Sequence, residues 1–287
     1  MSFDLFFTSI LYGLTIGSAL ILIASSLSII FGVMGVVNFA HGSLCMLGAY
    51  LGYSLILWKV NFWMALVISP LIVGTVALVI ERFTLRPLYG KNPMLQFLLT
   101  YGLAMIIGNL VLYFWGADPH GIERPIYLQG AISLAGIAYP KFRLFVLIFS
   151  AVLAIVLWLF ITRTTWGIIL RAGIHNRELV GAFGINMSAV YTLVFALGSA
   201  LAAVAGVILG AMRNINPAMD LDLVTGGLIA VVIGGLGSFR GAVLGALIIG
   251  LSESFGALLW PGFSKFTVYI VMVAILLWRP EGLIKEV

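Results

Sequence analysis

The sequence predicts an all-α polytopic membrane protein, and three observations lead to this fold class. Apolar residues make up 62% of the 287 residues, only 9% are charged, and the mean hydropathy is +1.19. A soluble domain carries about a quarter charged residues, so lipid is the expected outer solvent. Apolar blocks recur at the length of about 20 residues that a helix needs to cross the hydrocarbon layer. They do not alternate apolar and polar residues as the strands of a membrane barrel do.

Eight apolar blocks follow one another along the chain. They cover residues 5–31, 42–58, 62–80, 95–115, 144–161, 190–212, 224–258 and 266–278. The seventh block is long enough for a broken pair of helices. No Lys or Arg precedes the first block, so we expect a retained span there and not a cleaved signal peptide. The sequence therefore predicts a single transmembrane domain over residues 1–287 with about eight transmembrane segments.

The basic residues predict the orientation of the chain. Lys and Arg concentrate in short cytoplasmic loops, and here they gather at 82–91, at 163–177 and at the C-terminus. The C-terminus is then cytoplasmic and the N-terminus lies outside, together with the loop 116–142, although that loop holds Arg124 and Lys141. Such an orientation requires an odd number of crossings, so one block must dip in and return or the seventh must cross twice.

Two glycine-flanked interruptions share one pattern, VVNFAHGSLCMLG at 36–48 and GGLGSFRGAVLG at 234–245. Irregular backbone at membrane depth is stable only where it is buried in protein or lines a wet cavity. We therefore expect broken or re-entrant helices near both segments. Two interrupted segments in corresponding places are also typical of an internal repeat around a transport path, and this interpretation stays open beside a coincidental likeness of glycine-rich segments.

Polar side chains at these interruptions are the candidates for a translocation pathway. The candidate residues are Asn38, Phe39, His41, Ser43 and Ser238. They either bond the backbone at helix ends or line a polar path through the bundle, where an Asn and a His would otherwise be costly. A proton-coupled role is a third interpretation, but it lacks an acid, because no Asp or Glu is expected deep in a block except possibly Glu253. That residue is expected to face the surface.

The loop 163–189 contains an amphipathic segment that predicts a surface helix. An apolar stripe of Leu179, Val180 and Phe183 lies beside Arg171, Arg177 and Glu178. Gly184 suits the left-handed conformation that ends many helices. The helix either lies on lipid headgroups or contacts a partner.

Several classes of function lack their motifs in this sequence. There is no Gly-x-x-x-x-Gly-Lys-Ser/Thr loop, no Gly-x-Ser-x-Gly elbow and no His-Glu-x-x-His helix, so an enzyme is not expected and ATP is not bound through a phosphate loop. The single cysteine, Cys45, excludes an intrachain disulfide and leaves too little thiolate for a metal site. Basic residues are scattered, so no nucleic-acid partner is expected. Small residues at intervals of three and four in 199–211 and 241–250 predict tight helix packing.

Four segments resemble one known family. NFAHGSLCMLGAY at 38–50 is similar to the Asn-Phe-Ala-His-Gly signature of LivH-type permeases, the membrane subunits of bacterial branched-chain amino acid ABC importers. ELVGAFG at 178–184 resembles the Glu-Ala-Ala-x-x-x-Gly loop of ABC-importer permeases, although a Leu and a Val replace the alanines. Residues 234–254 and the ending WRPEGL at 278–283 resemble the family as well. The likeness covers nearly the whole chain.

The resemblance implies a permease subunit that forms half of a pathway for branched-chain, hydrophobic amino acids by ATP-driven alternating access. It implies a second permease of the LivM type, two cytoplasmic ATPases of the LivG and LivF type that bind ATP and Mg, and a periplasmic binding protein that delivers the amino acid. It places the chain in the bacterial inner membrane, in contact with lipid and without a cofactor of its own. Whether two copies pair in place of a heterodimer stays open.

The resemblance also gives the loop 163–189 the role of a coupling helix that docks in a groove of an ATPase. The residues expected to serve this coupling are Arg171, Arg177, Glu178, Leu179, Phe183 and Gly184. The alternatives are a permease of the same architecture for urea, short amides or other amino acids, and an ion-coupled carrier. The carrier would need charged residues inside the membrane.

Overall fold

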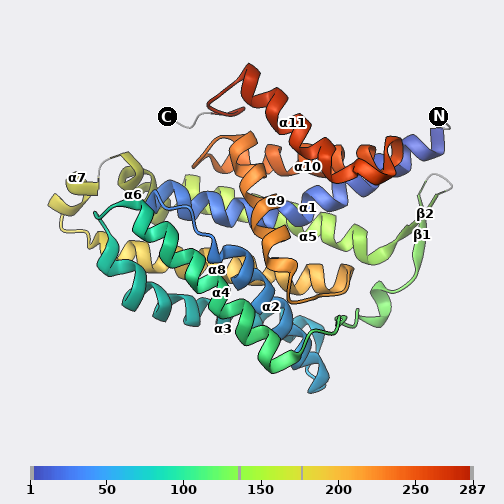
Figure 1. Cartoon of the computed structure of the whole chain (residues 1–287), viewed down its shortest axis with the longest axis horizontal. Coiled ribbons are helices and arrows are strands. Elements are labelled where there is room, and N and C mark those ends of the chain that lie inside the picture. Colours follow the sequence, from blue (N-terminus) through green and yellow to red (C-terminus); the bar gives the residue numbers. More distant parts are fainter. Residues whose placement is uncertain (1–2, 135–136, 176, 285–287) are drawn as a thin grey trace.

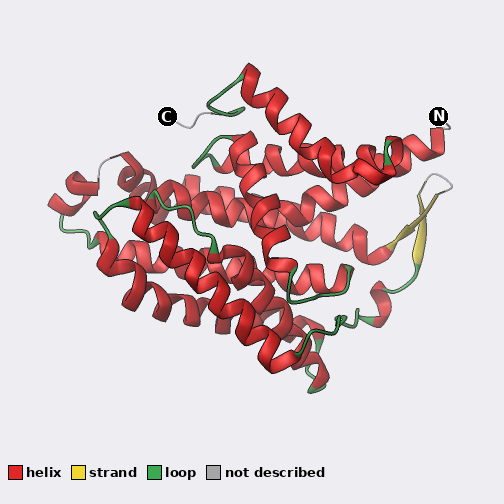
Figure 2. Cartoon of the chain, viewed as in Figure 1, coloured by secondary structure: helices red, strands yellow, loops and turns green. Residues whose placement is uncertain are grey.

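The chain folds into a bundle of helices in a computed structural model that describes residues 3–134, 137–175 and 177–284 (Figures 1 and 2). The longer helices are α1 (Phe3–Met34), α2 (Ala40–Leu57), α3 (Phe62–Ile80), α4 (Pro93–Trp115), α5 (Lys141–Arg163), α8 (Met187–Met212), α9 (Met219–Gly234), α10 (Phe239–Leu259) and α11 (Ser264–Trp278). The short elements are the π-helical turn Glu81–Leu85, the 3₁₀ turns Arg86–Leu88, Ile126–Leu128 and Pro261–Phe263, α6 (Thr165–His175), α7 (Arg177–Ala182), β1 (Ala131–Leu134) and β2 (Ile137–Pro140).

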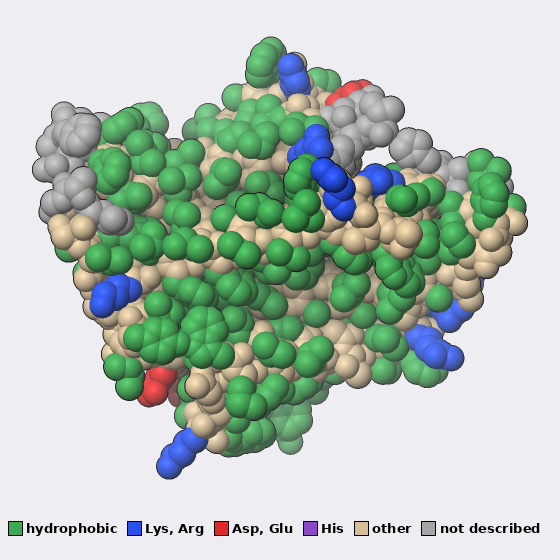
Figure 3. Space-filling view, turned by 180° about the vertical axis from the view of Figure 1, so that it is seen from behind, with side chains coloured by type: hydrophobic (Ala, Val, Ile, Leu, Met, Phe, Trp, Pro, Cys, Tyr) green, Lys and Arg blue, Asp and Glu red, His purple; other side chains and the backbone are tan. Residues whose placement is uncertain are grey.

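Eight helical segments of the described chain are long and apolar enough to cross a membrane. These are α1, α2, α3 with the turns that follow it, α4, α5, α8, α10, and α11 with its preceding turn. The predicted all-α polytopic class is confirmed. Figure 3 shows hydrophobic side chains over most of one face, with few charged side chains among them.

Both predicted breaks are present. The first separates α1 from α2, and it begins at Gly35, whose φ of 67° is left-handed. The second divides the seventh apolar block into α9 and α10, with Gly235 at φ 112° and Gly237 at φ 82°. Residues C-terminal to each break are already helical, from Ala40 and from Phe239 onward. The irregular backbone is therefore shorter than the segments 36–48 and 234–245 within which it was expected.

The two breaks lie next to each other, and the C-terminal segment covers the second. A Cβ added at Gly32, near the end of α1, would lie 3.3 Å from the Cα of Gly237. The backbone N–H groups of Leu283 and Ile284 donate to the carbonyls of Ile233 and Gly234, both at 2.9 Å. These carbonyls belong to the last turn of α9 and have no partner within that helix. The family-like ending WRPEGL therefore closes the second break through its backbone.

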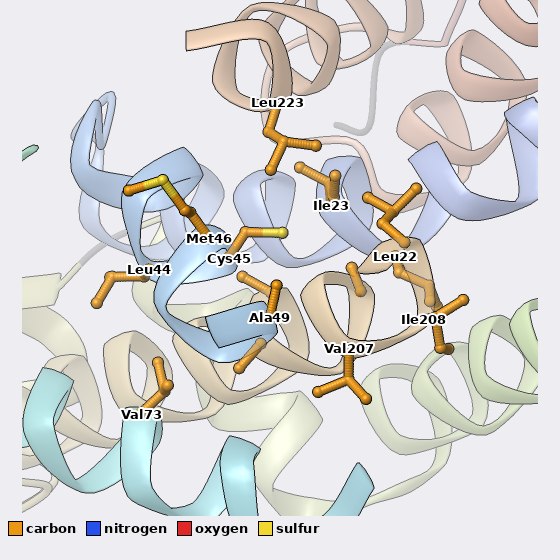
Figure 4. Packing of buried hydrophobic residues seen from close by; sticks show 14 of the residues in the cluster. Leu22, Ile23, Leu44, Cys45, Met46, Ala49, Val73, Val207, Ile208 and Leu223 are labelled. Atoms are coloured by element: carbon orange, nitrogen blue, oxygen red, sulfur yellow. The ribbon is translucent and has the colours of Figure 1, made fainter. Parts of the chain in front are cut away.

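Close helix contacts through small residues surround α1 and α8. An added Cβ at Gly250 of α10 would collide with the backbone of Gly13 and Gly17 in α1, and one at Gly206 of α8 would collide with the carbonyl of Cys45 in α2. Figure 4 shows the core, where side chains from α1, α2, α3, α8 and α9 meet. The tight packing predicted for 199–211 and 241–250 is confirmed.

The segment between α4 and α5 packs against the end of α8, opposite the end that carries α6 and α7 (Figure 1). It contains the antiparallel pair β1–β2, which the sequence did not predict. Arg124 donates from Nε to the carbonyl of Ala211 at 2.5 Å and stacks over the ring of Phe142. Arg143 lies 4.3 Å from the ring centre of Tyr12. Both basic residues are therefore held by contacts with distant parts of the chain, namely the end of α8, α5 and α1.

Candidate functional site

The polar residues of the first break are buried completely. Asn38 and His41 are 0% exposed and Ser43 is 1% exposed. Phe39 is half-buried and meets the ring of Phe97 in α4 edge-on, with centroids 4.7 Å apart. Asn38 and Phe39 end the irregular segment, and the other two lie in the first turn of α2. These three polar side chains do not reach solvent where the two helices part, so they have to find hydrogen bonds within the protein.

Asn38 stabilises the start of α2. Its Oδ1 accepts a hydrogen bond from the N–H of Ala40 at 3.1 Å, and its carbonyl accepts one from the N–H of His41 at 3.3 Å. These are N–H groups that the helix itself leaves without partners. The helix-end interpretation is confirmed for the oxygen atoms of Asn38. Its Nδ2 has no hydrogen-bond partner among the described residues.

His41 pairs with α1. Its Nε2 lies 2.9 Å from the Oγ of Ser26, and that hydroxyl also lies 2.8 Å from the carbonyl of Leu22, to which it donates. Which of the two atoms donates depends on the tautomer of the ring. The other ring nitrogen, Nδ1, has no partner in the described chain.

Further unpaired polar atoms lie on the helices around the first break. Buried atoms without a partner among the described residues include Ser25 Oγ, Ser28 Oγ, Asn38 Nδ2, His41 Nδ1 and Ser199 Oγ. They come from α1, the first break and α8, and we call them the polar seam. Each costs free energy when unsatisfied, and buried groups of this kind are usually satisfied by ordered water.

Ser43 leads to an acid that the sequence analysis did not select. Its Oγ donates to Oδ2 of Asp220 at 2.9 Å, and an added Cβ at Gly42 would collide with the carbonyl of the same aspartate. Asp220 lies in the first turn of α9, where the helix dipole favours a negative charge. It precedes the seventh apolar block, and for this reason it was not counted as part of a span.

Glu81 is a buried acid that the sequence analysis did not select. It is 0% exposed at the end of α3. Thr192 donates to its Oε2 at 2.5 Å, and the hydroxyl of Tyr89 donates to its Oε1. Burial, reinforced by the hydrogen bond to Glu81, raises the pKa of Tyr89, so this phenol stays protonated and continues to donate. Glu253 is half-buried and lines a surface cavity.

Ser238 serves as the N-cap of α10. Its Oγ accepts from the N–H of Gly241 at 3.0 Å and its side chain is 1% exposed. In the described chain no hydrogen bond joins it to Asn38, His41 or Ser43. The two breaks thus meet through glycine backbone, and their polar side chains are not brought into one cluster.

The expected surface helix corresponds to α6 and α7 at the end of the bundle, and residue 176 between them lies outside the described residues (Figure 1). Gly184 has the expected left-handed conformation, with φ 82°. Phe183 is 84% exposed and Leu179 is 58% exposed, whereas Val180 is buried. The stripe is therefore split, with one residue packed inward and two directed outward.

The charged residues of this loop are used differently from the expectation or are not described. Arg171 donates from Nη1 to the carbonyl of Ile161 at 2.6 Å and so caps the last turn of α5. The side chains of Arg177 and Glu178 lie outside the described residues. In the part of the chain that is described, no group of three His, Cys, Asp or Glu side chains is arranged to hold a metal ion.

Comparison with known proteins shows which family this chain resembles. The family model for the permease component of branched-chain amino acid transport systems matches residues 9–276. The permease protein BraD of Pseudomonas aeruginosa is 30% identical over 95% of this chain and 93% of its own length. LivH of Escherichia coli K12 is 28% identical over the same shares. A solved ABC transporter described as metal-chelate type, in an inward-facing conformation, aligns with a TM-score of 0.51 at 16% identity, over 96% of this chain and 88% of that one, and supports the fold alone.

Proposed function

Because this chain belongs to the family of branched-chain amino acid transport permeases, we propose that it forms half of the pathway of an ATP-driven importer for such amino acids. It is a multi-pass membrane subunit of a transport system and not itself an enzyme. The observation that carries the proposal is the family match over nearly the whole chain. The names of the relatives supply the substrate class, namely leucine and similar apolar amino acids.

The polar seam is our candidate for the pathway. It lies where α1 and α2 part, beside the residues predicted for this role, Asn38, His41 and Ser43. Its unpaired donors and acceptors can form hydrogen bonds with a solute that passes through. In this structure the surrounding helices bury the seam completely. Alternating access requires such a closed state between two open ones. Phe39 adjoins the seam as an aromatic wall against α4, whereas Ser238 caps α10 at the second break.

The helix pair α6–α7 is our candidate for coupling to an ATPase. Two large apolar side chains, Leu179 and Phe183, are exposed one turn apart at the end of the bundle. Exposed apolar residues at a helical spacing of four are the pattern by which a helix docks into a groove. Arg171 fixes α6 to the end of α5, so a displacement of α6 is transmitted to a membrane helix. Arg177, Glu178 and Gly184 complete the proposed docking segment.

The proposed orientation places α6–α7 and the C-terminus in the cytoplasm and the N-terminus outside. With eight spans both ends would lie on one side. The 16-residue helix α9 supplies a ninth, short crossing, which runs at a steep angle to α1 and α8 (Figure 1). The partners proposed are a LivM-type permease, two LivG/LivF-type ATPases that bind ATP and Mg, and a periplasmic binding protein. The exposed faces of α4, α5 and α11 offer surface to a second permease and to lipid.

Two other functions have some support. Urea or a short amide would suit the same polar seam, but the family match favours branched-chain amino acids. An ion-coupled carrier would use acids shielded from solvent, and the described chain has Glu81, which is buried, and Asp220, which is half-buried. Both bond to neutral hydroxyl groups in the closed bundle, which fits a structural role.

The coupling proposal is tested by isolation of the tagged chain in mild detergent from its own host. We expect an ATPase to co-purify and to hydrolyse ATP. Phe183→Ser removes an exposed apolar group without any loss of internal packing, so the bound ATPase should be lost while the chain folds normally. The matched control is Phe114→Ser, which changes another exposed phenylalanine at the opposite end of the bundle. Equal ATPase recovery with both variants would contradict coupling through α7.

A further inference from the structure

A surface cavity of about 350 Å³ lies between α1, α9, α10 and α11. Its rim includes the last residues of α8 and the start of α5, so it opens toward the end of the bundle that carries β1–β2 (Figure 1). Small-molecule sites in proteins span about 300–1,000 Å³. The cavity therefore has the size of a site for a small solute, and it lies apart from the polar seam.

Charged side chains are concentrated on this cavity. Three bases and two acids line it in a chain of which only 9% is charged. They are Arg143, Arg213, Lys265, Asp222 and Glu253. The two signs are present together, as recognition of a zwitterion requires, since a carboxylate needs a cationic donor and an ammonium needs an anionic acceptor.

Two of these charges are available to a ligand. Among the described residues, the guanidinium of Arg213 has no ion pair or hydrogen bond, and the carboxylate of Glu253 has none either. Lys265 pairs with Asp222 at 3.3 Å, but both side chains are more than half exposed. Exposed pairs contribute little to stability, so this pair can open at low cost.

The wall beneath the charges is aliphatic and branched. It includes Leu20 of α1, Ile229 of α9, Ile249 of α10 and Val268 of α11. The last three are less than 10% exposed and belong to the second core cluster. A branched aliphatic side chain inserted here would be removed from water, which stabilises by about 25 cal/mol per Å² of buried apolar surface.

We infer that this cavity is an entry subsite for a zwitterionic amino acid with a branched aliphatic side chain, an inference that rests on the proposed function. Arg213 binds the carboxylate, Glu253 binds the ammonium group, and the side chain enters the aliphatic wall. Because the cavity opens at the end proposed to lie outside, it receives the solute before the polar seam does.

A lipid with a zwitterionic headgroup carries the same pair of charges. Its acyl chains would stay in the surrounding bilayer, so the aliphatic wall beneath the charges would receive no side chain from it. The cavity is bounded by four helices and has room for one small solute. We therefore commit to the amino acid and make the lipid one arm of the test.

The test uses the cysteine content of the chain. Cys45, the one cysteine, is 0% exposed, so a cysteine introduced at Thr225 in the cavity becomes the accessible thiol of this subunit. The rate of maleimide labelling of this subunit is measured in the intact importer, reconstituted in phosphatidylglycerol vesicles, whose headgroup carries no cation, with and without leucine. At leucine about ten times its Kd, mass action leaves about a tenth of the sites free, so labelling should slow about tenfold.

Three variants and two ligands test whether protection is specific to the cavity and to its charged groups. Lys59→Cys places a thiol at an exposed position off the cavity and should label at the same rate with and without leucine. In the Thr225→Cys background, Arg213→Gln should abolish protection by leucine. In the same background, 4-methylpentanoate, which lacks the ammonium group, should protect weakly, and Glu253→Gln should bring leucine down to that level.

The outcomes separate this inference from the proposed function. If leucine leaves the labelling rate unchanged while ATP-driven leucine uptake by the same vesicles persists, the subsite is contradicted and the proposed function stands. If phosphatidylethanolamine alone slows labelling and leucine adds nothing, the cavity binds lipid and the inference is overturned. If the vesicles take up another solute but no leucine, both the subsite and the proposed function are contradicted.

Discussion

Glu81 is a buried side chain that connects two membrane helices near the end of the bundle that carries α6 and α7. A carboxylate removed from water is stable only when hydrogen bonds compensate its lost hydration. Glu81 accepts one bond from Tyr89, which follows α3, and one from Thr192 in the second turn of α8. Since α8 begins shortly after α7, this carboxylate joins the end of α3 to the helix that any movement of α7 reaches first.

Thr192→Val should destabilise the chain. The substitution keeps the shape of the side chain and removes the hydroxyl that donates to the buried carboxylate of Glu81. Loss of a hydrogen bond to a charged group costs about 1.5–3 kcal/mol, so the midpoint of thermal unfolding in detergent should fall clearly. Thr75→Val is the control, because the Thr75 hydroxyl only returns to the carbonyl of Leu71 in its own exposed turn. Equal midpoints for the two variants would show that Glu81 does not depend on Thr192.

Residue roles were predictable where the partner is close in sequence. The interruption at Asn38 and its helix-end role follow from local pattern, as does the left-handed Gly184. The roles of Glu81 and Asp220 depend on Thr192 and Ser43, each more than a hundred residues away in sequence. Glu81 also precedes a run of basic residues that is typical of a loop, which concealed its burial.

At the scale of elements, α1 and α10 form a helix pair whose close packing requires glycine. Gly13 and Gly17 of α1 face Gly250 of α10 with backbone against backbone. Without a hydrophobic driving force between helices in lipid, such close van der Waals packing stabilises their association. The pair also holds the second break in place, since α10 begins directly after it.

Gly250→Ala should separate α1 from α10. The new methyl group would meet backbone atoms that cannot move aside, and overpacking of this kind costs about 1–3 kcal/mol. Gly102→Ala in α4 is the matched control, because no atom lies within 4 Å of an added Cβ there. That control should gain about 0.5–1 kcal/mol, since alanine favours a helix over glycine. The unfolding midpoints of both variants are measured in detergent. If they shift in the same direction, the close glycine packing of α1 against α10 does not determine the stability of the chain.

Elements with a strong apolar signal were predicted, and short ones were not. All eight blocks correspond to helices, and the glycines of the seventh located its division. The pair β1–β2 was missed because each strand has four residues and its stability depends on the other strand.

On the scale of the whole molecule, buried surface is distributed unevenly among the helices. The core gathers around α1, α2 and α8, whereas α4, α5 and α11 bury little of their surface within the chain. Two features at opposite ends of the bundle, the cavity beside α9 and the helix pair α6–α7, are joined by α1 and α10, which run between them (Figure 1). In the proposed function, a movement of α6–α7 alters access at the other end through these two helices.

The measurement that tests the central claim most directly is leucine uptake by vesicles that contain the purified importer and its binding protein. The account predicts uptake that requires hydrolysable ATP, stops with a non-hydrolysable analogue and persists when ionophores collapse proton and sodium gradients. Uptake that continues without ATP and ceases when those gradients are collapsed would contradict it, and would make the chain an ion-coupled carrier that uses its buried acids.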